Sequence, residues 1–181
     1  EARLNVSVSS QSCRVMSSLI RIIAAPYRAA QLWKRPAMKS EYVGKTGITR
    51  AQQRVLLEWA AAVLPAFLPV FAADRPEDRR LEKALETAKR WLADETPYET
   101  VGLNDIRAAA LAAHAAARDA SDGPPRFVAR AVGQAVSIAH VPTHAAGVWY
   151  YLAKATDNDP AVLEYLRSAL PLELWGIAFP Q

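Results

Sequence analysis

A chain of 181 residues can bury a core without disulfides, and the single cysteine, Cys13, excludes an internal disulfide framework. Alanine is abundant and glycine scarce, which favours helices, because alanine costs least in a helix and glycine is among the costliest residues. The longest apolar run, at residues 59–73, is short and contains two prolines, so the sequence predicts no transmembrane helix. A cytoplasmic location is expected, because a secreted disulfide scaffold is disfavoured.

The net charge of +4 is distributed unevenly along the chain. Residues 1–40 hold one acidic residue, Glu1, and seven basic residues, a net charge of +6, whereas the remainder holds 15 basic and 17 acidic residues, a net charge of −2. Because the body of the chain is close to neutral, the charge does not indicate a nucleic-acid-binding domain. The basic residues of the extension are Arg3, Arg14, Arg21, Arg28, Lys34, Arg35 and Lys39.

The N-terminal extension contains one segment with helical character. Residues 14–34 place an arginine every seven residues among apolar ones, which predicts a basic amphipathic helix kinked near Pro26. Such a segment can be a targeting or docking segment, can lie on an anionic membrane, or can be a remnant upstream of the true start. We therefore expect a basic extension and linker at residues 1–48 and an α-helical domain at residues 49–181.

The first half of that domain shows clear helix signals. Thr49 can cap a helix together with Gln52 or Gln53, and Pro65 and Pro69 should kink or end it. An apolar stripe at 81–92 predicts an amphipathic helix that Pro76 could open. A short helix is expected at 96–99. The alanine-dominated helix at 106–120 is expected to lie centrally, because small side chains let neighbouring helices approach closely.

Prolines also punctuate the second half. Pro124 and Pro125 open a helix, Pro142 interrupts the pattern that follows, and the last helix is capped by Asp159 and ended by Pro171. No segment alternates with a period of two, and no internal repeat is present. The sequence therefore predicts an all-α fold, a single compact bundle of about six to eight helices with a basic N-terminal extension.

Three histidines are the candidate metal ligands. His140 and His144 would share a face of a continuous helix, as pairs of zinc ligands do. However, Val141 breaks the HExxH pattern, and Pro142 should distort the helix between them. We expect packing or a helix-terminal hydrogen bond as their role and predict no cofactor. A small helical metal-dependent enzyme or metalloprotein built on His114, His140 and His144 remains the alternative.

A stripe of Arg107, Leu111, His114 and Arg118 falls on one side of the alanine-rich helix. It could bind an anionic ligand or an acidic partner, or it could be a solvated face with incidental charges. Beside these cations His114 should be mostly neutral at pH 7, and we expect it to form hydrogen bonds between helices. The candidate partner-binding or structural polar site is Arg107, His114, Arg118, His140 and His144.

No pattern of nucleophilic or nucleotide chemistry is found. Ser137 and Ser168 lack a GxSxG elbow, and the glycines are isolated, so the phosphate-loop and dinucleotide fingerprints are missing. Among the aromatic residues 149–151, Tyr150 is expected at the rim and the other two in the core. These features favour a binding protein over an enzyme.

Three segments carry a resemblance to a known family: RPEDRRLEKALETAKRWL at 75–92, IRAAALAAHAAARDA at 106–120 and ARAVGQAVSIAHVPTHAAGVWYYLAKA at 129–155. From about residue 54 to 175 the chain resembles bacterial immunity proteins of polymorphic toxin systems with an immunity-protein-five-like domain. This resemblance implies an α-helical protein that binds and blocks a cognate protein toxin, with no enzymatic activity. The basic extension lies outside it.

Removing residues 1–40 should leave the rest of the chain folded, because the amphipathic helices from 49 to 170 can cover one another. Urea unfolding of the truncated and full-length proteins, followed by circular dichroism, checks this. If the truncated protein loses cooperative unfolding, residues 14–34 belong to the core and the expected boundary is wrong.

Overall fold

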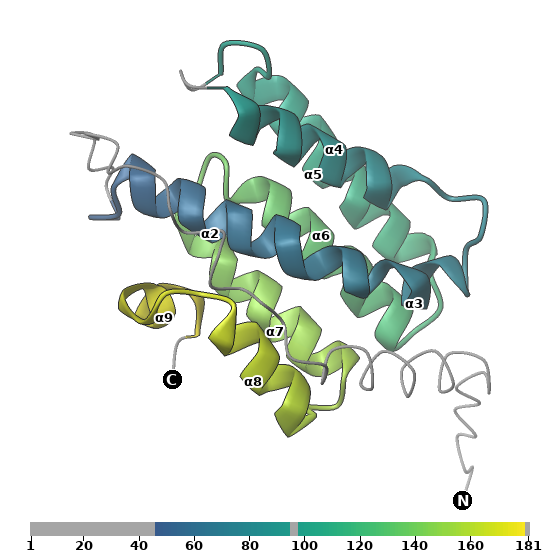
Figure 1. The fold of residues 1–181 in the computed structure, drawn as a ribbon. Coiled ribbons are helices and arrows are strands. Elements are labelled where there is room, and N and C mark those ends of the chain that lie inside the picture. Colours follow the sequence, from purple (N-terminus) through teal and green to yellow (C-terminus); the bar gives the residue numbers. More distant parts are fainter. Residues whose placement is uncertain (1–45, 95–97, 180–181) are drawn as a thin grey trace, which may run out of the picture.

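The computed structural model describes residues 46–94 and 98–179 (Figure 1). These residues form eight α-helices and three short 3-10 helices and contain no β-strand, which confirms the predicted all-α bundle. None of the described helices is both long and apolar enough to cross a membrane. The basic helix predicted at 14–34 lies outside the described residues.

The elements in chain order are α2 (Arg50–Val63), η2 (Leu64–Ala66), α3 (Leu68–Ala72), α4 (Arg80–Ala93), α5 (Leu103–Asp119), α6 (Pro124–Ser137), η3 (Pro142–His144), α7 (Ala145–Ala155), α8 (Pro160–Ser168), η4 (Leu172–Leu174) and α9 (Trp175–Ala178).

Local sequence signals set several of these boundaries as predicted. Thr49 and Gln52 form a reciprocal capping box at the start of α2, with the Gln52 backbone N–H donating to Thr49 Oγ1 (3.2 Å) and the Thr49 N–H donating to Gln52 Oε1 (2.9 Å). Asp159 caps α8 by accepting hydrogen bonds from the first two backbone N–H groups after Pro160. Pro65 and Pro69 lie in η2 and α3, just after α2 ends.

Two local predictions were wrong. The helix α4 begins at Arg80 rather than at Pro76; Asp78, just before the N-cap residue Arg79, accepts a hydrogen bond from the Arg80 backbone N–H (3.0 Å), the first N–H of the helix. Residues 98–100 form a turn and bend instead of the predicted short helix, and residues 95–97 lie outside the described part. The Asp94 carboxylate accepts hydrogen bonds from the Thr100 backbone N–H (2.9 Å) and hydroxyl (2.5 Å), which stabilises this turn.

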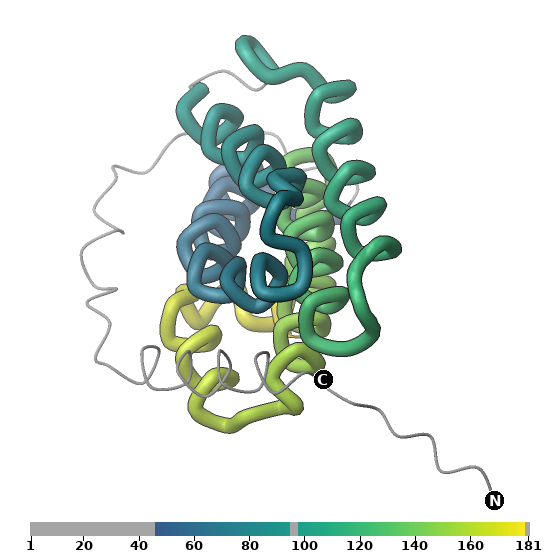
Figure 2. Tube along the Cα trace, turned by 90° about the vertical axis from the view of Figure 1, so that its right-hand side faces the viewer, coloured from purple at the N-terminus to yellow at the C-terminus, as the bar shows by residue number. Residues whose placement is uncertain are grey.

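The helices α5, α6 and α7 lie side by side in one layer, as Figures 1 and 2 show. The helices α2, α3 and α4 pack against one side of this layer, and α8 and α9 contact α7. Buried alanines and valines fill the inner sides of α5 and α6. The sequence predicts a central position for the alanine-rich helix α5. One side of this helix is buried, but the side that carries Arg107, Leu111 and Arg118 is exposed, so α5 lies at the edge of the layer.

The helix α2 connects the ends of three other helices. Gln53 Nε2 donates to the carbonyl of Ile138 (2.6 Å) after α6, and Trp59 Nε1 donates to the carbonyl of Leu166 (2.9 Å) in α8. The buried Arg54 donates to the carbonyls of Leu92 and Asp94 (3.0 Å to Asp94) at the end of α4. Carbonyls at helix C-termini have no partner within their own helix, so α2 supplies the missing donors and fixes these ends.

Candidate functional site

The stripe predicted on α5 lies on the part of the helix that the rest of the protein leaves largely uncovered. Arg107 and Arg118 are exposed, Leu111 is 65% exposed, and His114 is half-buried. Exposure of a leucine to this degree between two arginines distinguishes this side from the buried alanine side of the same helix. The stripe is thus available for contact with a partner.

His114 packs directly against α6 at Gly133. A Cβ atom on Gly133 would lie 2.5–2.9 Å from three atoms of the imidazole ring, so a larger residue there would displace the ring. The Nδ1 atom of His114 is buried without a hydrogen-bond partner among the described residues. The predicted hydrogen bond between helices is therefore not formed by this atom, and close packing on glycine takes its place.

His140 and His144 come together where the helical path is interrupted. Pro142 opens the 3-10 helix η3, and the two imidazole ring centroids lie 5.6 Å apart. His144 Nδ1 lies 2.6 Å from Gln134 Oε1 of α6, so a hydrogen bond joins the two side chains. His140 Nδ1, like that of His114, is buried and has no hydrogen-bond partner in the described part of the chain.

Burial lowers the pKa of all three histidines below the ordinary value. For His114 the next causes are the charges of Arg130, Arg118 and His144, and for His140 they are those of His144 and Arg107. The histidines are therefore neutral at pH 7. The sequence argument expected neutral His114 because of nearby cations, but burial has the larger effect.

Sequence reasoning missed two residues of α6 that complete this cluster. Arg130 approaches His114 closely enough to lower its pKa, and Gln134 bonds His144. The helix α7 comes close to α6 here, because a Cβ on Gly147 would lie 2.6 Å from Gln134 Oε1. Phe127, Arg130 and Gln134 are three and four residues apart, so they share one side of α6, and all three are half-buried. This helical spacing was the only sequence feature that could have linked Arg130 and Gln134 to the site.

An aromatic group continues the same surface onto α7. Phe127 stacks on Tyr151 with ring centroids 6.5 Å apart, and Lys154 Nζ lies over the rings of Phe127 (5.6 Å) and Tyr150 (4.8 Å). Tyr150 is 50% exposed, the rim position that the sequence predicts. We call this side of α5, α6 and α7 the outer face, comprising Arg107, Leu111, His114, Arg118, Phe127, Arg130, Gln134, His140, His144, Tyr150, Tyr151 and Lys154.

The outer face is cationic. Residues 106–118 and 123–156 contain no aspartate or glutamate. Within the described part of the chain, Arg107, Arg118 and Arg130 form no ion pair, whereas Arg79, Arg80 and Arg126 each contact a carboxylate. The near-neutral charge of the body therefore hides a local excess of positive charge.

The three histidines do not form a metal site in this structure. Among the described residues no group of three or more His, Cys, Asp or Glu side chains is arranged to hold a metal ion. The hydrogen bond to Gln134 also occupies Nδ1 of His144.

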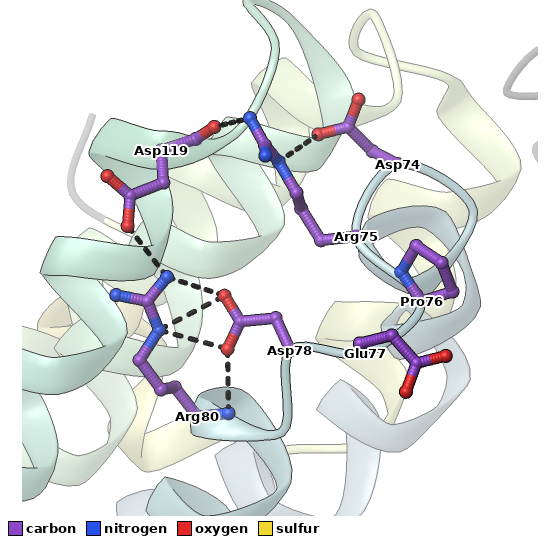
Figure 3. Close-up of a pocket in the computed structure, with 7 residues that line it drawn as sticks. All are labelled: Asp74, Arg75, Pro76, Glu77, Asp78, Arg80 and Asp119. Atoms are coloured by element: carbon purple, nitrogen blue, oxygen red, sulfur yellow. Dashed lines mark hydrogen bonds and ion pairs between the residues drawn. The ribbon is translucent and has the colours of Figure 1, made fainter.

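A second candidate site is an open cavity of about 620 Å³ where the α3–α4 loop meets the end of α5 (Figure 3). Arg80 binds Asp78 (2.5 Å) and Asp119 (2.7 Å), and Arg75 donates to the Asp119 carbonyl and pairs with Asp74. The hydrogen bonds from Arg80 hold the pKa of Asp78 below its usual value. Because both arginines are already paired, this cluster fastens the loop to α5 rather than forming a receptor.

Residues 46–168 match the family model described as "Imm-5 like putative immunity protein". The described fold is all-helical, and the match supplies the class of protein, a family described by an immunity role. Because the match covers more than half of the chain, the chain belongs to the Imm-5 like family. All residues of the outer face lie inside the matched range. Comparison with curated proteins and with solved structures gave no match.

Replacing Gly133 by alanine should destabilise the fold by about 1–3 kcal/mol, because the new methyl group overlaps the His114 ring. The displaced ring should become more exposed, so its pKa should rise towards the ordinary value. Urea unfolding and NMR titration of His114 Cε1–H measure both effects. Gly176→Ala is the matched control, since its Cβ meets no atom within 4 Å and should change stability little. Unchanged stability and an unmoved His114 pKa in Gly133→Ala would contradict the packing argument.

The free energy of unfolding should fall as the pH drops from about 7.5 to 5.5. Each histidine has a lowered pKa in the folded state, so below pH 6.5 the unfolded state binds more protons and protonation favours unfolding. Urea titrations at the two pH values measure the decline. A variant carrying His114→Gln, His140→Gln and His144→Gln should lose most of it, and an equal decline in this variant would refute the assignment.

Proposed function

We propose that this protein is an immunity protein that neutralises a cognate bacterial toxin by binding it directly, without catalysis, in the cytoplasm. Family membership supports the immunity role, and the cationic outer face within the matched range supports a binding mechanism. The single observation that carries the proposal is the exposed Leu111 set between arginines that have no carboxylate partner among the described residues.

The composition of the outer face suits a protein interface. Arginine and tyrosine are enriched where truncation costs most binding energy, and Leu111 offers an apolar contact between polar groups. Isolated exposed leucines are common on proteins, so Leu111 alone would not mark an interface. Its position between Arg107 and Arg118, beside the half-buried histidines, gives a central contact with a charged rim.

The test takes candidate toxins encoded by genes neighbouring this one and titrates each with the purified protein. Direct binding predicts that toxin activity falls linearly with added protein and reaches zero at a fixed molar ratio, and that both chains elute as one complex in gel filtration. Catalytic inactivation would instead let a small amount of protein abolish all toxin activity with time. That second outcome, or the absence of a complex, would overturn the proposal.

A further inference from the structure

We infer that the outer face binds an acidic protein surface, with carboxylate side chains seated between the arginines of α5 and Arg130 of α6 and an apolar residue seated on Leu111. That the partner is a toxin rests on the proposed function. The chemistry of the partner, a surface rich in aspartate and glutamate, follows from the outer face itself.

The pairing of α5 with α6 brings the charged groups into one surface. Residues 120–123 connect α5 to α6 in a short turn, and His114 of α5 lies on Gly133 of α6, so the two helices run antiparallel along their contact. The charge of Arg107 lowers the pKa of His140, and the charges of Arg118 and Arg130 both lower the pKa of His114. The arginines thus surround a patch whose floor consists of neutral, half-buried imidazole rings.

This arrangement lacks the negative charge that would balance it. Arg118 and Arg130 both lie near His114, Arg107 lies about three helical turns from Arg118 along α5, and no carboxylate of the described residues forms an ion pair with any of the three. The planar guanidinium matches a carboxylate in a bidentate geometry, and such charge-assisted bonds are among the stronger hydrogen bonds in proteins. A partner that brings carboxylates to this patch therefore supplies both the missing charge and the missing acceptors.

The aromatic part of the outer face argues for a protein rather than a nucleic acid. Stacking of bases requires free ring faces. Here Phe127 stacks on Tyr151, Lys154 lies over Phe127 and Tyr150, and the two tyrosines contact each other edge to face at 5.1 Å. These internal contacts occupy the rings, and Leu111 offers an apolar contact instead of a stacking surface.

Charge complementarity then restricts how a toxin is bound. Surfaces in a specific complex carry opposite potentials, and a cleft that binds nucleic acid is basic. The cationic outer face would repel such a cleft. If the toxin acts on nucleic acid, the outer face therefore binds it outside the cleft, on an acidic surface.

The experiment uses the full-length protein and labelled poly-L-glutamate of about 20 residues as the probe, with fluorescence anisotropy at low and at physiological salt. The test variant is Arg107→Glu/Arg118→Glu on the outer face. The matched control is Lys83→Glu/Lys89→Glu, which makes the same charge change at exposed positions of α4. The inference predicts binding that is at least about ten-fold weaker in the test variant than in the control, a difference of about 1.4 kcal/mol.

NMR of the unaltered protein locates the binding site without the use of charge-reversal variants. Addition of poly-L-glutamate should shift the Cε1–H resonances of His114, His140 and His144 and raise their pKa, because a nearby carboxylate favours the protonated imidazole. Unmoved histidine resonances, or equal weakening in the two charge-reversal variants, would overturn the inference. So would tighter binding of a single-stranded oligothymidine that the outer-face variant alone abolishes.

Folding and the proposed function are separated from this result. Thermal unfolding verifies that both charge-reversal variants are folded. If the Arg107→Glu/Arg118→Glu variant is unfolded, the milder Arg107→Gln/Arg118→Gln variant replaces it. A protein that inhibits its toxin but does not bind poly-L-glutamate at the outer face overturns this inference alone. A protein that binds poly-L-glutamate there but forms no toxin complex overturns the proposed function alone.

Discussion

The close approach of α5, α6 and α7 is the constraint on which the rest of the structure depends. It requires glycine at two crossing points, where His114 covers Gly133 and Gln134 covers Gly147. A β-carbon at either point would force the neighbouring side chain away. Because the helices lie so close, polar side chains from three separate elements form one continuous surface instead of three separate stripes.

The inner helix α2 holds this layer in place through polar rather than only apolar contacts. Its Gln53, Arg54 and Trp59 donate to carbonyls at the ends of α6, α4 and α8. A buried carbonyl without a donor is costly, so these bonds fix where each helix ends. The outer face therefore lies on helices that α2 already holds in position. A partner that binds this face then has to order fewer side chains and less backbone.

Charge is segregated by the fold. Around the α3–α4 loop, Arg75, Arg79 and Arg80 each pair with a carboxylate, that of Asp74, of Glu82, and of Asp78 and Asp119 respectively. The arginines of the outer face are not neutralised by the described residues, and the half-buried histidines beside them stay neutral because burial disfavours their charged form. A chain whose body is nearly neutral thus presents one surface suited to an acidic partner.

The sequence by itself determined the all-helical class, the caps at Thr49 and Asp159, the breaks at prolines, and the stripe from Arg107 to Arg118, because these follow from helical periodicity and from interactions within a few residues. The family resemblance was also readable from it. Only the tertiary structure decided that Arg130 and Gln134 join the stripe and that His114 packs on Gly133 with its Nδ1 atom unpaired among the described residues. Contacts between residues far apart in the chain decide which faces of helices meet, and local spacing carries no information on that.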